Sequence, residues 1–451
     1  MSTPAAKAPC AVIVGLGRTG LSSARHLRRL GWRVAVTDTR EQPPELLALR
    51  ELDPRIPLRT GGLDTSLLDG AVCVVASPGV SLAAPFFAEA RRRGLEIIGD
   101  IELFARAADA PVVGITGTNG KSTVTTLVGR MAARAGVNVR VGGNLGEPAL
   151  DLLSAEGAPR RPDLYVLELS SFQLEATYSL ALKAATVLNV TPDHLDRYAS
   201  IEEYANAKAR IFARCDTAVI NLDDPLVVAM PHEGQRTLSF SLRAAIGADY
   251  SISITGADCW LMRRTEALLP ISAMRIKGMH NAANALAALA LGEALELPMA
   301  AMLTELKEFP GLPHRSQWVA DVRGVAYIND SKGTNVGATI AAVGGMSGPL
   351  IMIAGGDGKN QDFAPLAAAF RGKVRHTVLI GRDAGAIENA LQGICTTETC
   401  TSLQEAVRAA ARAAKPGDTV LLSPACASLD MFRDYTQRGA VFSEAVRELA
   451  A

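Results

Sequence analysis

Short runs of apolar residues alternate along the chain with segments in which apolar positions recur every three or four residues. The runs are typical of buried strands, and the spaced positions are typical of helices with one buried face. A chain that alternates strands and helices predicts parallel α/β sheets. Near the N-terminus the predicted strands are residues 11–14, 33–37, 72–76 and 96–98, with helices ending near Leu30 and covering 100–107.

The same alternation continues to the C-terminus and is interrupted by two breaks, at residues 108–111 and 309–315. Proline, glycine and small residues at these breaks are typical of domain boundaries. We therefore expect an α/β protein of three domains, residues 1–106, 107–311 and 312–451. The later predicted strands are 163–168, 185–190, 218–221, 325–328, 349–354, 377–380 and 419–422, with short strands within 237–267 and a long helix from 277–284 to about Leu295.

The second predicted domain starts with a buried strand, a loop of glycine, threonine and asparagine, and a helix. Residues 114–120 form the loop, and Lys121 and Ser122 follow it. Strand, glycine loop and helix form a phosphate cradle, in which backbone N–H groups and the helix dipole point at one anion. Lys121 adds a charge there, and the Ser122 hydroxyl suits Mg²⁺. The first glycine of the standard P-loop is displaced, with Ile115 in its place, and a turn that binds nothing is the alternative.

The first predicted domain carries Gly-x-Gly-x-x-Gly at residues 15–20, after its first strand, and Asp38 at the end of its second strand. Taken alone, this arrangement predicts an NAD-type dinucleotide site. Because a phosphate loop follows in the next domain, we prefer a site that binds a nucleotide diphosphate without hydride transfer. An empty Rossmann-like turn is the alternative. Ser77, after the next strand, is either a further contact or part of an ordinary turn.

Several polar residues of the second domain each have two interpretations. Glu168 ends a predicted buried strand and suits a Mg²⁺ ligand, or it is a surface acid that caps the next helix. His194 has a metal or substrate role, or it is structural. Lys208 lies near the apolar face of a helix, which by pattern alone predicts a charged end that reaches water. Asn281 and Asn284 cap their helix, the favoured interpretation, or bind a base or ribose.

Polar loops follow the predicted strands of the third domain, at residues 329–335, 355–359, 381–383 and 423–428. In a doubly wound sheet such loops meet at one edge, where ligands bind. Ser428 is predicted to open a helix that starts at Leu429. The Ser428 hydroxyl and the helix N-terminus could together hold a carboxylate. The alternative is that Ser428 simply caps the helix, and both can hold at once.

Composition narrows the class of protein. The 451 residues include 46 Lys and Arg and 46 Asp and Glu, and this balance argues against a general binder of nucleic acid or anionic membranes. No apolar run approaches the roughly 18 residues of a membrane span, and residues 1–9 lack a signal-peptide core. We expect a cytoplasmic enzyme without nucleic-acid or membrane partners. The seven cysteines lack Cys-x-x-Cys spacing and are expected to be reduced thiols.

Four motifs together resemble the ATP-dependent Mur ligases of peptidoglycan synthesis. They are Gly-Thr-Asn-Gly-Lys-Ser at 117–122, Asn-Val-Thr-Pro-Asp-His-Leu-Asp at 189–196, His-Asn-Ala-Ala-Asn-Ala at 280–285 and Leu-Pro-His-Arg at 312–315. Three more, at 329–332, 355–359 and 423–428, look like those of the members that add D-glutamate. The resemblance covers essentially the whole chain. It implies a Rossmann-like UDP-binding N-terminal domain, a P-loop-type central ATPase domain and a Rossmann-like, amino-acid-binding C-terminal domain.

The resemblance also implies the reaction and its partners. ATP would phosphorylate the carboxylate of UDP-N-acetylmuramoyl-L-alanine to an acyl phosphate, which the amine of D-glutamate would attack through a tetrahedral intermediate. Lys121 and Mg²⁺ would balance the charge that develops on the γ-phosphoryl group. The family pattern places one Mg²⁺ on Ser122 and Glu168 and a second on His194. Lys208 matches the family's carbamylated lysine, which reverses the interpretation from its pattern, and we expect a monomer.

The family pattern assigns the candidate residues to four groups. The catalytic residues are Lys121, Glu168, His194 and Lys208. The ATP site takes Gly117, Thr118, Asn119, Gly120, Lys121, Ser122, Thr123, Asn281, Asn284, Arg315 and Asp330. The UDP-substrate site takes Arg18, Thr19, Asp38, Thr39, Arg40, Ser77, Asn144, Ser170 and Gln173. The D-glutamate pocket takes Lys332, Thr334, Lys359, Ser428 and Tyr435, the last in place of the family's phenylalanine.

Three other functions fit parts of the chain. A different amide ligase of the same superfamily would add another amino acid, or add glutamate to folate, and would differ in its acceptor pocket. A nucleotide-dependent switch or transport ATPase would hydrolyse ATP without an amino acid, but it leaves Lys359 and Ser428 without a role. An NAD dehydrogenase would transfer hydride and change the absorbance of NAD(P)H.

Overall fold

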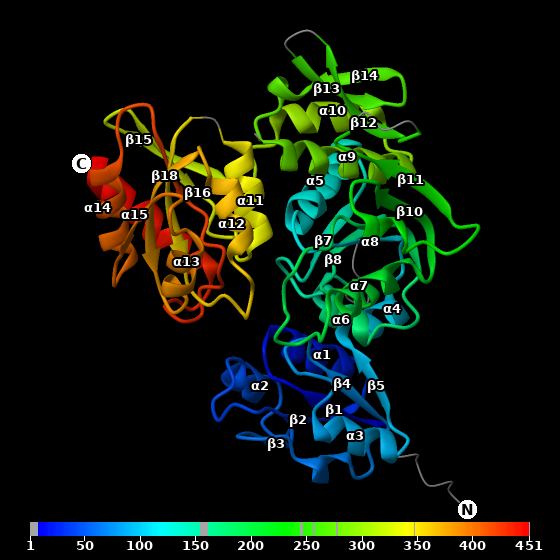
Figure 1. The fold of residues 1–451 in the computed structure, drawn as a ribbon. Helices are drawn as coiled ribbons and strands as arrows, with labels where there is room; N and C mark the ends of the chain where they lie inside the picture. The colour runs from blue at the N-terminus through cyan, green and yellow to red at the C-terminus, as the bar shows by residue number, and fades with distance from the viewer. Residues whose placement is uncertain are drawn as a thin grey trace, which may run out of the picture.

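The computed structural model describes residues 8–153, 161–243, 247–255, 258–276, 278–346 and 348–450. Lys277, parts of the predicted strands within 237–267 and most of the stretch that lacks a signal-peptide core lie outside these ranges. Three sheets follow one another along the chain, each flanked by helices (Figure 1). This confirms the predicted α/β class.

The first unit is a parallel five-stranded sheet with helices on both faces. Its elements are β1 (Cys10–Val14), α1 (Arg18–Arg29), β2 (Arg33–Thr37), α2 (Leu46–Leu52), β3 (Leu58–Arg59), η1 (Thr65–Leu68), β4 (Cys73–Ala76), α3 (Pro85–Arg92), β5 (Glu96–Gly99) and α4 (Asp100–Ala107). The strand order is β3-β2-β1-β4-β5. Starting from β1, the chain adds β2 and β3 on one side of the sheet and β4 and β5 on the other. The loops after β1, β2 and β4 therefore border one crevice at the carboxyl edge of the sheet.

The second unit carries a nine-stranded sheet. Its elements are β6 (Val112–Thr116), α5 (Lys121–Arg134), β7 (Val139–Gly143), η2 (Ala149–Leu152), β8 (Leu164–Glu168), α6 (Ser171–Glu175), β9 (Leu182–Val187), α7 (Ile201–Ala209), η3 (Arg210–Phe212), β10 (Cys215–Asn221), α8 (Pro225–Val228), β11 (Arg236–Phe240), β12 (Tyr250–Thr255), β13 (Asp258–Arg263), β14 (Glu266–Pro270), η4 (Ile271–Ala273), α9 (Met279–Ala294) and α10 (Met299–Glu308). The order is β14-β13-β12-β11-β10-β9-β6-β8-β7. The strands β6 to β12 are parallel to one another. With β6 between β8 and β9, the loops after these three strands meet where α5 begins.

Three details of this unit differ from the sequence prediction. The strand expected at 185–190 is β9, which ends at Val187 because the next residues pair with the phosphate loop: the Thr118 N–H donates to Asn189 O at 2.9 Å. The cluster Gly-Gly-Asn-Leu-Gly at residues 142–146 predicts a turn after a strand, but Gly142 and Gly143 are the last residues of β7. The helix α10 was not predicted. It packs beside α9, and its buried face includes the charged Glu305, which interrupts the apolar pattern along α10.

The third unit is a six-stranded sheet. Its elements are β15 (Gln317–Val322), β16 (Val325–Asn329), α11 (Val336–Gly345), β17 (Leu350–Gly355), α12 (Ala364–Phe370), β18 (Val374–Ile380), α13 (Ala384–Ala390), β19 (Thr396–Thr399), α14 (Leu403–Ala413), β20 (Thr419–Leu422) and α15 (Tyr435–Ala450). The order is β15-β16-β20-β17-β18-β19, and only β15 is antiparallel. The four predicted strands are confirmed as β16, β17, β18 and β20, whereas the edge strands β15 and β19 were not predicted.

The helix predicted to start at Leu429 is wrong. Ser428 opens a single turn, in which the N–H groups of Met431 and Phe432 donate to its carbonyl oxygen at 3.1 and 2.8 Å. The helix α15 starts only at Tyr435, where the Asp434 carboxylate accepts the Gln437 N–H at 2.8 Å. A cap therefore exists here, but Asp434 provides it and Ser428 does not.

Two further properties of the described residues concern the class of protein. No helix among them has the length and apolar character needed to cross a bilayer. All seven cysteines lie within the described ranges and are free thiols. Burial raises the pKa of the Cys215 and Cys426 thiols to about 12, which keeps both protonated at neutral pH.

Candidate functional site

The phosphate loop connects β6 to α5 and ends at Gly120, which has the left-handed φ of 86°. A Cβ at Gly120 would collide with the Asn284 side chain, so only glycine fits this position. No side chain caps α5, and its first N–H groups remain available to an anion in the loop. The displaced glycine pattern thus still forms the strand, loop and helix arrangement that the sequence predicts.

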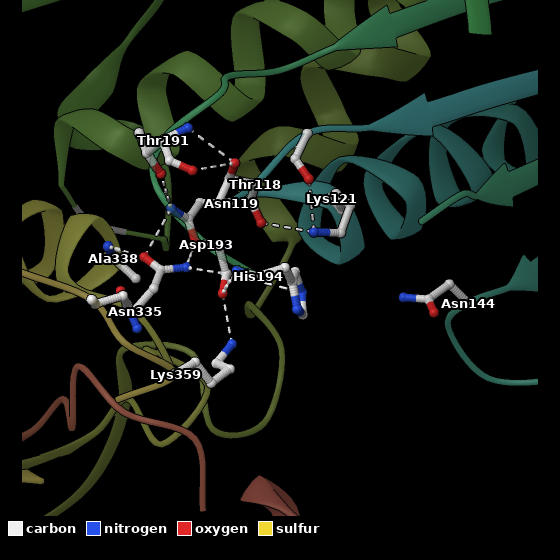
Figure 2. A network of polar contacts seen from close by, with 12 residues as sticks. Thr118, Asn119, Lys121, Asn144, Thr191, Asp193, His194, Asn335, Ala338 and Lys359 are labelled. Atoms are coloured by element: carbon white, nitrogen blue, oxygen red, sulfur yellow. Dashed lines mark hydrogen bonds and ion pairs between the residues drawn. The ribbon is translucent and has the colours of Figure 1, made fainter. Parts of the chain in front are cut away.

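Lys121 stands at the start of α5 with its ammonium turned back into the loop (Figure 2). Its Nζ donates to the carbonyl oxygens of Gly117 at 2.9 Å and Thr118 at 2.7 Å. Burial lowers the pKa of this amine, and the charge of Glu168 opposes that shift. The loop therefore holds one partly buried lysine side chain at the point where the helix dipole and the backbone amides also converge.

Glu168 ends β8 and faces the start of α5. Its Oε2 accepts the Ser122 hydroxyl at 2.5 Å, and its Oε1 accepts the Asn144 amide at 2.8 Å. Burial alone would raise the pKa of this carboxyl, but the charge of Lys121 and these hydrogen bonds hold it below its usual value. The alternative of a surface acid that caps α6 is wrong, because Glu168 is buried and Ser170 caps that helix.

His194 lies in the loop after β9, with a left-handed φ of 56° and its ring 4.9 Å from that of Phe172. Burial lowers the pKa of the imidazole to about 4, so the ring is neutral at physiological pH. A non-glycine residue held in this conformation is unusual and often belongs to a functional site.

Lys208 points into the molecule from α7, and the prediction that its charged end reaches water is wrong. The side chain is 1% exposed, and its Nζ donates to Gly117 O at 2.9 Å above the Tyr204 ring. Burial, and next the charge of Lys121, lower the pKa of this amine well below its usual value. A buried amine with a lowered pKa therefore lies directly against the phosphate loop.

A cavity of about 250 Å³ lies beside the phosphate loop, between the second and third units. It is lined by Asn281, Asn284, Arg315 and Asp330 of the predicted ATP set, together with apolar residues including Leu188, Phe240 and Ile276. The favoured interpretation of the two asparagines as caps is wrong, since Gly278 is the N-cap residue of α9. The Asn284 amide instead donates to Asn281 Oδ1 at 3.2 Å, on the wall of the cavity.

A second cavity, of about 280 Å³, joins the phosphate loop to the third unit. Its lining includes the predicted catalytic and acceptor residues Lys121, Ser122, Glu168, His194, Lys208, Lys332, Thr334 and Lys359. Arg315, from the linker before β15, enters it and donates to the Ser122 hydroxyl at 2.5 Å. Residues separated by up to 238 positions, from Lys121 to Lys359, thus share one chamber rich in cations.

Two residues predicted for the acceptor pocket do not line this cavity. Ser428 is 3% exposed and lies in the turn before α15. Tyr435 instead supports Lys332, whose Nζ lies 4.0 Å from the centre of its ring. Burial, together with Arg315, lowers the pKa of Lys332 to about 7.

A third cavity, of about 500 Å³, lies between the first and second units and gathers most of the predicted UDP set. Its lining includes Arg18, Thr19, Asp38, Thr39, Arg40, Ser77, Asn144 and Gln173. Asp38 is held by the Arg40 guanidinium and by the Leu16 N–H, both at 2.6 Å. Ser170 lies in the second cavity instead, and Asn144 borders both.

The chain has close relatives along its whole length. Family models match residues 10–99 (Mur ligase MurD-like, N-terminal domain), 115–292 (Mur ligase middle domain) and 314–426 (Mur ligase, glutamate ligase domain). A UDP-N-acetylmuramoylalanine--D-glutamate ligase from Methylococcus capsulatus is 51% identical over 97% of this chain and 95% of its own length. Another of that name, from Marinobacter nauticus, is 52% identical over 97% of this chain and 98% of its own. The chain belongs to the Mur ligase family.

Solved structures share the fold at low sequence identity. UDP-N-acetylmuramate-alanine ligase MurC from Thermotoga maritima superposes with a TM-score of 0.62 at 19% identity, over 97% of this Mur ligase and 99% of that chain. A pseudomurein peptide ligase type C from Methanothermus fervidus gives 0.61 at 18%, over 98% and 100%. These likenesses establish the fold and leave the acceptor amino acid to other observations.

A metal ion in the second cavity of this Mur ligase would need mixed donors. No group of three or more His, Cys, Asp or Glu side chains in the described ranges is placed to hold one. The cavity does offer the ionised Glu168, the Ser122 hydroxyl and the neutral His194 ring. This set fits Mg²⁺ when further oxygens come from phosphate, water or a carbamate, because Mg²⁺ prefers oxygen and retains several waters.

Two polar residues of the site, Asp193 and Asn335, were not predicted to have a role. Asp193, next to His194, accepts the Lys359 ammonium at 2.6 Å. Asn335, directly after Thr334, caps α11, and its side-chain amide donates to Asn119 and Asp193. Both stand in motifs dense in polar residues, and that density is the only signal in the sequence that marks them.

Proposed function

We propose that this Mur ligase joins D-glutamate to UDP-N-acetylmuramoyl-L-alanine in an ATP-dependent reaction of peptidoglycan precursor synthesis. The observation that carries the proposal is the second cavity, where a phosphate loop and the acceptor-side cations Lys332 and Lys359 line one chamber. The names of full-length relatives at about 50% identity supply the two substrates. We further propose that the enzyme is cytoplasmic and monomeric.

We propose one substrate for each unit. Residues 1–106 would bind the UDP moiety in the cavity that contains Arg18, Asp38 and Ser77. Residues 107–311 would bind ATP, with its base in the cavity beside Asn281 and Asn284. Residues 312–451 would bind D-glutamate. Asn144 borders the first and the catalytic cavities, so the muramoyl chain would pass it on the way to the phosphate loop.

The proposed chemistry starts with a carboxylate, which is a poor electrophile. Transfer of the γ-phosphoryl group to a carboxylate oxygen makes an acyl phosphate, and ADP leaves. Lys121 and Arg315 would balance the charge that builds up on the phosphoryl oxygens. The D-glutamate amine would then attack the carbonyl carbon, the tetrahedral intermediate would expel phosphate, and the amine proton would be lost to give the amide.

We propose that Mg²⁺ is held on the cavity wall by Ser122, Glu168 and His194, with two ions in all. Its contribution is to neutralise charge on the phosphate oxygens. Lys208 would take part as a carbamate, formed when its neutral amine adds to CO₂ and releases one proton. The low amine pKa supports this assignment, since only the unprotonated form can react.

The acceptor site is proposed around two cations that suit a dicarboxylic amino acid. Lys359 carries an ammonium that pairs with the Asp193 carboxylate at 2.6 Å, and this pairing supports a role for Lys359 beside a carboxylate of the acceptor. Lys332 lies against Tyr435, and Thr334 follows it into the cavity. We propose that Ser428 also belongs to the acceptor pocket.

The acceptor amino acid tests the function. With ATP, Mg²⁺ and UDP-N-acetylmuramoyl-L-alanine, we expect phosphate release and amide product with D-glutamate. Turnover with L-glutamate, L-alanine, L-lysine or meso-diaminopimelate should be lower by about a hundredfold or more. A missing carboxylate, or a stereocentre of the wrong hand that clashes with the pocket, would leave the acceptor-side cations without a partner. Phosphate release coupled to product chromatography makes the measurement. Preferred turnover of any of these four, or of ATP alone, would replace the proposal with another ligase or with an ATPase.

A further inference from the structure

Asn335 occupies a junction between the second and third units. It is the N-cap residue of α11, is 2% exposed, and follows the loop that carries Lys332 and Thr334. Its Oδ1 accepts the Ala338 N–H at 2.8 Å, which fixes the orientation of the amide. The Nδ2 end of the side chain therefore faces away from its own helix.

The amide nitrogen of Asn335 donates to two residues of the second unit. One bond goes to Asn119 Oδ1 at 3.2 Å and the other to Asp193 Oδ2 at 3.3 Å. Figure 2 shows Asn335 beneath the phosphate loop, with Asp193 between it and Lys359. One NH₂ group thus satisfies two acceptors that come from separate loops, after β6 and after β9.

Each of these partners leads to a different part of the site. Asn119 belongs to the phosphate loop, and its backbone N–H is anchored on Asn189 Oδ1 at 2.8 Å. Asp193 accepts the Lys359 ammonium with its other oxygen, at 2.6 Å. A continuous path of hydrogen bonds therefore runs from the phosphate loop through Asn335 and Asp193 to the acceptor-side cation.

We propose that Asn335 is a positioning residue that couples the phosphate loop to the acceptor pocket. By holding Asp193, it fixes where the Lys359 ammonium stands. By holding Asn119, it ties that position to the conformation of the loop. The inference rests on the proposed function and deepens it. The acceptor pocket is expected to reach full affinity for D-glutamate only when Asn335 at the start of α11 is bonded to Asn119 of the phosphate loop.

A simple capping role is the alternative, and the chain offers matched substitutions against it. Serine caps other helices here: the Ser200 and Ser402 hydroxyls accept N–H groups at 3.3 and 3.2 Å. Asn335→Ser keeps a cap but is too short to reach Asn119 and Asp193. Asn335→Asp also keeps a cap and places a second carboxylate beside Asp193. Capping alone predicts near-normal kinetics for both variants.

The test is a matrix of initial rates with ATP and D-glutamate varied. For Asn335→Ser we expect the KM for D-glutamate to rise about tenfold and the KM for ATP to change less than about twofold, since bonds to a charged partner are lost on the acceptor side. Asn335→Asp should raise the KM for D-glutamate further. The unfolding midpoint of Asn335→Ser should stay close to that of the unaltered protein, because the cap is retained.

A double-mutant cycle separates coupling from local damage. Asn119→Ala should raise the KM for D-glutamate in the unaltered background and add little in the Asn335→Ser background. Additive effects, or unaltered D-glutamate KM values in both Asn335 variants, would overturn the inference. If the unaltered protein itself does not use D-glutamate, the proposed function fails instead, and the two failures remain distinct.

Discussion

Replacing Lys121 with alanine is expected to lower kcat on the order of a thousandfold, the scale seen when a buried charge-stabilising group is removed. The side chain is partly buried, and its ammonium is bonded to two loop carbonyls, so it is aimed before ATP arrives. No other lysine is bonded to both carbonyls among the described residues, and Arg315 donates to the Ser122 hydroxyl. Single-turnover measurement of phosphoryl transfer checks this prediction.

The control for Lys121 is a lysine of the same unit outside the site. Lys183, on β9, is 46% exposed on its side chain and pairs with Asp216 at 3.8 Å. Lys183→Ala should keep normal turnover, because an exposed ion pair contributes little to stability. Near-normal turnover of Lys121→Ala, with Lys183→Ala as the reference, would remove the phosphate loop from the mechanism.

Lys208→Ala is expected to lower kcat by about a hundredfold or more, and short carboxylic acids are expected to restore part of the loss. The substitution removes a buried amine that we assign to a carbamate, and it leaves a space beneath the phosphate loop. Formate or acetate can enter such a space and return an anion to the position. Turnover is measured over a concentration series of each acid.

Lys121→Ala is the control for this rescue, because the same acids should not restore a missing cation. Depleting CO₂ and bicarbonate should also slow the unaltered enzyme while leaving Lys208→Ala unaffected. Absence of rescue by every acid tested, together with indifference of the unaltered enzyme to CO₂, would refute the carbamate and leave Lys208 as a buried support for Gly117 O.

The features that sequence analysis predicted correctly are those that local pattern determines. A strand followed by glycines and Lys-Ser requires only neighbouring residues, so the cradle around Lys121 was predictable even with its displaced glycine. Glu168 and His194 were predictable as candidates because Glu168 ends one buried strand and His194 follows another, and the carboxyl ends of these strands meet at one edge.

The features that were missed depend on partners far along the chain. The burial of Lys208 follows from a bond to Gly117, 91 residues away, and helical spacing alone does not reveal it. Asp193 and Asn335 meet across 142 residues. The false helix start at Ser428 has a local cause: apolar residues follow a serine, but the cap that decides the boundary is Asp434.

The fate of a labelled carboxylate oxygen tests the central claim, that the γ-phosphoryl group of ATP is transferred to a substrate carboxylate at the phosphate loop. UDP-N-acetylmuramoyl-L-alanine with ¹⁸O at both oxygens of its alanine carboxylate is turned over with ATP and D-glutamate, and the released phosphate is analysed by mass spectrometry. Attack on the γ-phosphorus by that carboxylate predicts one labelled oxygen in each phosphate formed. Phosphate without label, released in step with amide product, would contradict the account.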